Sequence, residues 1–262
     1  MVSIYDELKA LSDENYKKFQ TGLVPNISPD TVIGVRTPDM RKIADSLFKS
    51  GDYEEFLESL PHKWYEENLV HFFIIGLIKD FDECVRRVEA FLPFVDCWPV
   101  SDQSSPKVFK KYHDRLLPYI EKWTASPHVY TSRFGIRMYM NEFLGGDFKE
   151  EYLEFISKRC ARGVKEYSSG KTRNGYSVPE EAGDDYYHRM MVAWYFATAL
   201  AKKYDAAVKY METGNAEGKN GKDTKTGGIT PLDEWTRRKS IQKAVESFRV
   251  SEEHKAYLKS LR

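Results

Sequence analysis

Apolar residues recur at helical spacing along almost the whole chain of 262 residues, and this periodicity limits the fold class more than any other feature. Spacings of three and four place side chains on one face of an α-helix, and no segment alternates as a β-strand would. Turns rich in proline, glycine and serine separate helical segments of about 10 to 18 residues. The sequence therefore predicts an all-α protein. The clearest apolar series are Ile4, Leu8 and Leu11; Met40, Ile43, Ala44 and Leu47; and Leu116, Leu117, Ile120 and Trp123.

The succession of short-linked helices predicts antiparallel helix pairs stacked into a curved solenoid of HEAT-like units, each about 40 residues long. Thr37 and Pro38 predict the N-cap and the first turn of one helix. We expect residues 1–262 to form a single domain with polar inserts near 163–185 and 214–228. Lys171 and Arg173 in the first insert could hold a phosphate backbone or belong to a surface loop.

The charge is neutral overall but uneven along the chain. Forty basic residues balance forty acidic ones, which by itself disfavours nucleic-acid binding. Residues 105–140 nevertheless carry seven basic against two acidic residues, and residues 235–262 carry eight against three, each a net charge of +5. Residues 51–70 carry one against six, a net charge of −5. This distribution fits either a basic face for a polyanion or ordinary solvated helix faces.

Several classes of protein are disfavoured by what the sequence lacks. No apolar run approaches the roughly 20 residues of a membrane helix, and the first residues lack a signal-peptide profile, so a cytoplasmic protein without membrane contact is expected. Cys84, Cys97 and Cys160 have no metal-ligand spacing, which predicts reduced thiols. No nucleotide-binding fingerprint or nucleophile elbow occurs. We expect no metal and no cofactor.

Three segments carry side chains suited to a cationic substrate beside a phosphate. Trp98 and Asp102 are four residues apart, so on one helix they would share a face. Pro99 indicates instead that the chain turns after Trp98 before a helix resumes. Arg133 leads a predicted helix over 134–143, and Trp194 follows the first polar insert. Together they supply aromatic surfaces, a carboxylate and a guanidinium.

The chain resembles the AlkD-type DNA alkylation repair family over most of its length, apart from the two inserts. Trp98, Asp102, Arg133 and Trp194 fall on the family's first Trp, Asp, Arg and second Trp, whereas Pro99 departs from its pattern. The resemblance implies a curved HEAT-like solenoid and glycosylase excision of N3- and N7-alkylated purines. It rests on the segments Leu23–Asn26, Val32–Lys42, Val95–Asp102 and Trp235–Ala244.

The resemblance implies roles for individual residues. An alkylated purine is cationic and already a good leaving group, so Asp102 would stabilise the charge developing on the deoxyribose and orient water. Arg133 would hold the backbone phosphate and keep Asp102 ionised. Trp98 and Trp194 would contact the lesion and sugar through cation–π and C–H contacts. The expected partner is double-stranded DNA with alkylated purines, bound by a monomer. The expected contacts to the DNA backbone are Lys107, Lys110, Arg137, Arg237, Arg238 and Lys239.

Each assignment has a structural alternative. Asp102 could cap a helix starting at Lys107, Arg133 could pair with Glu142, and the tryptophans could be core residues. Two other functions also stay open, a non-catalytic relative that binds DNA or RNA structure and a scaffold for protein partners. A glycosylase predicts a basic groove with Asp102, Arg133 and exposed tryptophans, whereas a non-catalytic binder predicts that Asp102 is paired or turned away.

Overall fold

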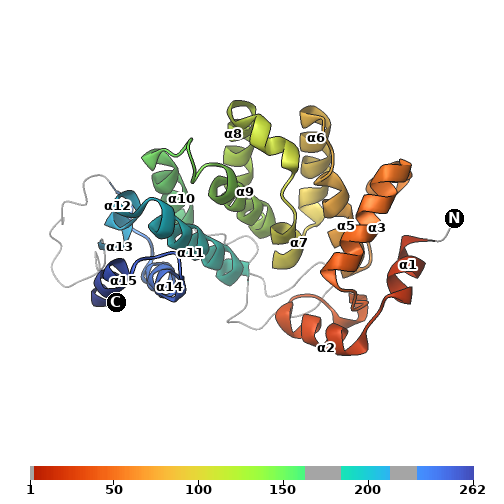
Figure 1. Ribbon diagram of the computed structural model, residues 1–262, viewed down its shortest axis with the longest axis horizontal. Helices are drawn as coiled ribbons and strands as arrows, with labels where there is room; N and C mark the ends of the chain where they lie inside the picture. Colours follow the sequence, from red (N-terminus) through yellow and green to blue (C-terminus); the bar gives the residue numbers. More distant parts are fainter. Residues whose placement is uncertain (1–2, 163–183, 213–228) are drawn as a thin grey trace. The chain divides into compact units, whose positions relative to one another are not determined.

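The computed structural model describes residues 3–162, 184–212 and 229–262, and every regular element among them is a helix (Figure 1). The all-α prediction is confirmed, and the packing of these helices on one another agrees with a HEAT-like fold. Apart from residues 184–185, which begin a helix, the two predicted inserts lie outside the described residues, Lys171 and Arg173 included.

The described helices fall into two compact units. Residues 3–117 belong to the first unit, and residues 118–162, 185–212 and 229–262 belong to the second. The boundary lies within α8 (His113–Thr124), next to the internal Pro118. A proline inside a helix cannot donate the backbone hydrogen bond of its turn. That residues 1–262 form one domain stays a prediction.

Helix α5 (Tyr65–Ile75) is the core of the first unit, because ten of its eleven residues are buried. A helix buried on almost all sides needs neighbours on each of them. Those neighbours are α1 (Ile4–Ala10), α3 (Thr37–Ser50), α6 (Phe81–Phe91) and α7 (Trp98–Gln103). The unit also contains α2 (Glu14–Leu23), α4 (Glu54–Glu58) and the 3-10 helices η1 (Pro29–Thr31), η2 (Leu92–Phe94) and η3 (Lys107–Lys111).

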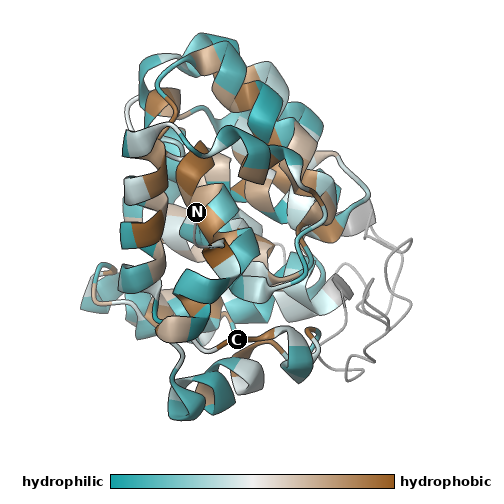
Figure 2. Ribbon diagram, turned by 90° about the vertical axis from the view of Figure 1, so that its right-hand side faces the viewer, coloured by the Kyte–Doolittle hydropathy of each residue, from teal (hydrophilic) through white to brown (hydrophobic). Residues whose placement is uncertain are grey.

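Burial along helix α3 follows the predicted apolar spacing. Met40, Ile43 and Ala44 are buried, whereas Arg41 and Lys42 are exposed. Most other helices, but not α5 and α9 (Val129–Glu142), also expose one side, and the hydropathy colours in Figure 2 show apolar and polar residues alternating along the ribbon. One face of each such helix can therefore pack while the other meets water.

The predicted start of α3 is wrong by one residue. Pro38 lies in the first turn as expected, but Arg36 and not Thr37 is the N-cap residue. The hydroxyl of Thr37 donates to Oε1 of Gln103 (3.2 Å) instead of capping the helix. The helix ends at Ser50, and its C-cap residue Gly51 has a φ of 84°, the left-handed conformation that glycine adopts most easily.

A buried carboxylate connects α5 to the segment that precedes α3. Glu66 is fully buried, and its Oε2 accepts a hydrogen bond from the backbone N–H of Ile33 (2.9 Å). Its Oε1 accepts from the N–H groups of Gly34 (2.7 Å) and Val35 (3.3 Å). Gly34 has a φ of 95°, and a Cβ there would lie 2.7 Å from the carbonyl oxygen of Asp13. Only glycine satisfies both the conformation and the close approach.

The second unit is built around α9 (Val129–Glu142) and α11 (Asp184–Lys202), which contribute the fully buried Phe134, Tyr139, Tyr195 and Phe196. Gly135 allows α9 to approach Thr124 closely, because a Cβ at this position would lie 2.4 Å from the backbone nitrogen of Thr124. The remaining helices are α10 (Glu150–Arg162), α12 (Tyr204–Ala207), α13 (Lys209–Glu212), α14 (Glu234–Glu246) and α15 (Glu252–Ser260).

Replacing Glu66 with glutamine tests the role of its carboxylate. The amide can accept hydrogen bonds on one side only, and its NH₂ group would face backbone N–H donors on the other. We expect Glu66→Gln to lower the free energy of unfolding by about 1–3 kcal/mol, measured by denaturant titration. The exposed Glu55 provides the control, since Glu55→Gln should change stability by less than about 0.5 kcal/mol. Equal stabilities of the two variants would refute this role.

Candidate functional site

Trp98 and Asp102 share one helix. Trp98 is the first residue of α7 and Pro99 lies in its first turn, where the missing N–H has no helical partner to lose. The predicted turn between Trp98 and the helix is therefore wrong. Because the two residues are four apart on a continuous helix, they lie on the same side of it, one turn apart.

The indole of Trp98 is partly exposed and its orientation is fixed. Its Nε1 donates a hydrogen bond to the carbonyl oxygen of Leu23 (3.0 Å). Asp102 is 5% exposed. It lies inside α7, and Pro106 occupies the N-cap position of η3, so Asp102 does not cap the helix that begins at Lys107.

Hydrogen bonds to distant parts of the chain hold both ends of α7. At its start, Nδ2 of Asn26 donates to the carbonyl oxygen of Asp96 (2.5 Å). At its end, Nη2 of Arg41 donates to the carbonyl oxygen of Gln103 (2.7 Å), and Oγ of Ser104 donates to that of Phe72 (2.7 Å). The position of this short helix thus depends on distant parts of the chain.

Arg133 is a buried residue of α9. This helix begins at Val129, so Arg133 lies in its second turn and does not lead it as predicted. The guanidinium is 4% exposed, and its Nη1 donates to the carbonyl oxygen of Tyr187 (2.7 Å) on α11. Arg133 therefore connects α9 to the helix that carries Trp194.

A buried histidine lies beside Arg133. Nε2 of His188 is 3.1 Å from Oγ of Ser132, which itself donates to the carbonyl oxygen of Thr124 (2.7 Å). The serine hydroxyl must therefore accept from the histidine, which carries its proton on Nε2. Burial, together with the nearby charges of Arg159 and Arg133, lowers the pKa of His188 to about 3.

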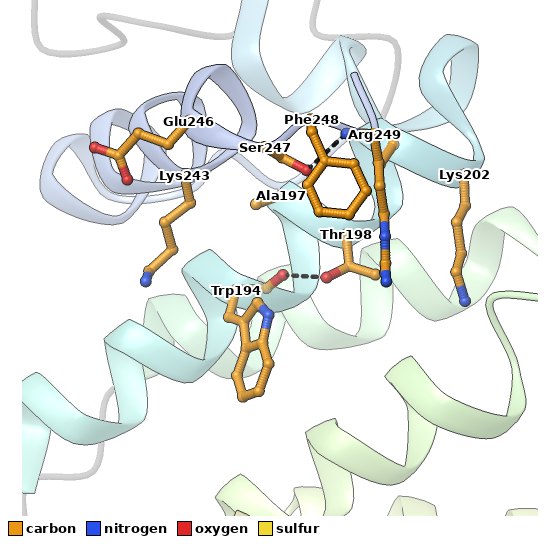
Figure 3. A pocket seen from close by; sticks show the side chains of 10 residues that line it. Trp194, Ala197, Thr198, Lys202, Lys243, Glu246, Ser247, Phe248 and Arg249 are labelled. Atoms are coloured by element: carbon orange, nitrogen blue, oxygen red, sulfur yellow. Dashed lines mark hydrogen bonds between the residues drawn. The ribbon is translucent and has the colours of Figure 1, made fainter. Parts of the chain in front are cut away.

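Trp194 is 38% exposed and lines a cavity of about 410 Å³ in the second unit (Figure 3). Its carbonyl oxygen accepts a hydrogen bond from Oγ1 of Thr198 (2.9 Å), one turn along α11. The cavity also contains basic side chains that were not predicted, Lys202, Lys243 and Arg249. Sequence could place Lys243 one turn after Lys239, but only packing reveals the cavity.

The predicted DNA contacts differ in their exposure. Lys107 and Lys110 are exposed on η3, and Arg137 is half-buried on α9. Arg238 is exposed on α14, and Lys239 on the same helix is half-buried. The last two line a second cavity, of about 440 Å³, where Arg238 pairs with Glu234 and Lys239 with Gln242.

Arg237 has an internal role. Its side chain is buried, and Nη1 donates to the carbonyl oxygens of Met211 (3.1 Å) and Leu261 (2.8 Å). Nε also forms an ion pair with Glu234 (3.0 Å). These bonds join α14 to the ends of two other helices. Because Nη2 also donates to Glu234 (3.2 Å), every guanidinium nitrogen of Arg237 is bound inside the protein, and Arg237 is not among the proposed DNA contacts.

The predicted residues form two groups, each described within its own unit. Trp98, Asp102, Lys107 and Lys110 belong to the first unit. The second unit contains Arg133 and Trp194, together with Arg137, Arg238 and Lys239.

The described part of the chain contains no group of three or more His, Cys, Asp or Glu side chains that could hold a metal ion. Cys84 and Cys97 are buried, and burial raises the pKa of the Cys84 thiol to about 12. The side chain of Cys160 is outside the described residues. No described helix has both the length and the apolar character needed to cross a membrane.

The low pKa of His188 predicts how acid affects the second unit. The neutral histidine is favoured in the folded state and protonation is favoured in the unfolded state, where its pKa is near 6.5. The contribution of neutral His188 to the free energy of unfolding is fully present above pH 6.5. It falls by up to about 1.4 kcal/mol per pH unit as the pH decreases toward 3. In His188→Gln the amide keeps the bond to Ser132 without titrating. Between pH 7 and pH 5, denaturant titration should show a smaller decrease in the free energy of unfolding for His188→Gln than for the wild-type protein. Equal decreases would contradict the assignment.

A family model described as "DNA alkylation repair enzyme" matches residues 4–160, which is more than half of the chain. The matched region contains Trp98, Asp102 and Arg133, while Trp194 and α14 lie beyond it. No curated protein and no solved structure matches the chain. The match agrees with the motifs around α3 and α7, and the chain belongs to the DNA alkylation repair enzyme family.

Proposed function

We propose that the protein is a glycosylase that hydrolyses the N-glycosidic bond of cationic N3- and N7-alkylated purines in double-stranded DNA. Membership of a DNA alkylation repair family supports this function. The observation that carries it is that Trp98 and Asp102 share one side of α7, a helix held at both ends by side chains of the matched region.

Asp102 would act on the sugar. Loss of a cationic base leaves positive charge on the deoxyribose, and a fixed carboxylate stabilises that charge without acting as an acid. The same group can orient the attacking water. Burial of Asp102 strengthens such an interaction, because little water screens it. Trp98 would place its aromatic face beside the cationic nucleotide.

The second unit would bind the DNA backbone. Arg133 offers a guanidinium whose orientation is fixed by Tyr187. Trp194 adds an exposed aromatic surface on the adjacent helix. Contacts of this type position a nucleic acid without reading its sequence. Lys107 and Lys110 of the first unit, with Arg137, Arg238 and Lys239 of the second, would add charge for the phosphates. We further propose that the protein acts as a monomer.

A second candidate function is binding of DNA structure without excision. The low exposure of both Asp102 and Arg133 favours it, since a non-catalytic relative would use these side chains inside the protein. Both candidates predict DNA binding. Only the glycosylase releases a base, and it needs Asp102 to do so.

The substitution Asp102→Asn tests the catalytic role. The amide keeps the shape of the side chain but loses its charge, so the developing sugar cation is no longer stabilised. We expect release of 7-methylguanine and 3-methyladenine from methylated duplex DNA to slow by at least about 100-fold under single-turnover conditions, with unchanged binding to an abasic-site analogue.

The exposed Asp114 offers a matched control, because Asp114→Asn removes a charge in α8 outside the proposed site. Excision at the wild-type rate by Asp102→Asn would refute the catalytic assignment. Absence of base release from the folded wild-type protein would favour the non-catalytic function.

Charge removal on η3 tests the proposed backbone contacts. Each phosphate contact releases counterions, so the slope of log K against log salt concentration changes by about 0.9 per contact. The double variant Lys107→Gln/Lys110→Gln should weaken duplex binding and reduce this slope by about 2, measured by fluorescence anisotropy. Lys49→Gln, which removes an exposed charge in the last turn of α3, should leave the slope unchanged. An unchanged slope in the double variant would exclude these lysines from the DNA contacts.

A further inference from the structure

Three basic side chains line the cavity beside Trp194. Lys202 comes from α11, Lys243 from α14, and Arg249 from the turn after α14. None of the three side chains forms a hydrogen bond or an ion pair with any residue that the structure describes. In Figure 3, Lys243 lies on one side of the cavity, and Arg249 and Lys202 lie on the other.

Glu246 is the only carboxylate that lines this cavity within the described residues, so the three cations outnumber the acidic groups there. Its Oε1 accepts a hydrogen bond from Nε2 of Gln242 (2.9 Å). Lys243 is partly desolvated, and its burial, with smaller contributions from the charges of Lys239 and Arg133, lowers its pKa although the nearby carboxylate of Glu246 opposes the shift. An anion that enters the cavity would gain charge-assisted hydrogen bonds from these cations.

A solvent-exposed aromatic ring lies at the edge of the same cavity. Phe248 is 88% exposed, an unusual position for a large apolar side chain. The guanidinium of Arg249 lies over its ring, 5.5 Å from the centroid. The turn is well anchored, since the N–H of Arg249 donates to Oγ of Ser247 (3.2 Å) and the next residue, Val250, is buried. The ring is therefore presented to solvent by a fixed backbone.

We propose that this cavity binds an unpaired nucleotide of single-stranded DNA, with its base stacked on Phe248 and its phosphates held by Lys202, Lys243 and Arg249. Aromatic platforms beside basic grooves are the usual means of binding single strands. Inside a duplex both faces of a base are covered by its neighbours, so only an unstacked base can reach the ring. The inference rests on the proposed function for the choice of DNA as ligand, and it does not depend on base excision.

An acidic peptide could also satisfy the three cations, but it would not require Phe248. The contribution of the base therefore separates the two kinds of ligand. We compare a labelled oligonucleotide of eight thymidines with an oligomer of equal length whose nucleotides lack bases, which has the same phosphates. Fluorescence anisotropy at fixed salt gives both dissociation constants.

The wild-type protein should bind the thymidine oligomer about 5- to 100-fold more tightly than the oligomer without bases. Phe248→Leu should abolish most of this difference and leave the affinity for the oligomer without bases unchanged. Lys243→Gln and Arg249→Gln should each weaken the binding of both oligomers. Each should also reduce the slope of log K against log salt concentration by about 0.7. Phe19→Leu is the matched control, because Phe19 is also strongly exposed but lies on α2 of the first unit.

Equal affinity of the wild-type protein for the two oligomers would overturn the proposal, as would thymidine binding that Phe248→Leu leaves unchanged. Failure of the proposed glycosylase function is detected separately. Asp102→Asn should lose excision while retaining the preference for the thymidine oligomer, whereas Phe248→Leu should lose that preference even if no base is ever released. Phe248 is almost fully exposed, so its replacement leaves the core intact.

Discussion

The first unit depends on the hydrogen bonds that the Glu66 carboxylate accepts. By accepting hydrogen bonds from three successive backbone N–H groups, this carboxylate fixes residues 33–35 against α5 and thereby sets where α3 begins. Arg41 of α3 then binds the carbonyl oxygen of Gln103 at the end of α7. Buried polar groups connected in this way stabilise one arrangement over others, because an unpaired group would be costly. The placement of Trp98 and Asp102 follows from that series of contacts.

The second unit fixes its candidate residues by different means. Arg133 and Arg237 are both buried guanidinium groups that donate to backbone carbonyl oxygens, and each joins helices that are distant in the sequence. Their fixed, planar donors suit this role better than a flexible lysine would. Positive charge in this unit is thus divided between internal cross-links and side chains such as Lys243 that face a cavity.

Local patterns predicted the helices, but tertiary contacts decided what individual residues do. Spacing alone identified the buried face of α3 and the four-residue relation of Trp98 to Asp102. It misjudged Pro99, because proline is tolerated in the first turn of a helix as readily as it ends one. Sequence alone also grouped Arg237 with Arg238 as DNA contacts. That grouping failed because adjacent residues on a helix point in different directions, and only packing shows that Arg237 is buried. The exposure of Phe248 and the cavity beside it could not be predicted, because they depend on how α11 and α14 meet.

The close approach of Gly135 to Thr124 limits which residues can replace this glycine. Helical glycines are usual targets for stabilisation, since alanine reduces the conformational entropy of the unfolded chain. Here the added methyl group would meet the backbone of α8, whose Thr124 carbonyl oxygen already accepts hydrogen bonds from Ser132 and Arg159. That backbone has no freedom to withdraw. The site is therefore closed to substitution for reasons of volume alone, and a stabilised variant must seek its gains elsewhere.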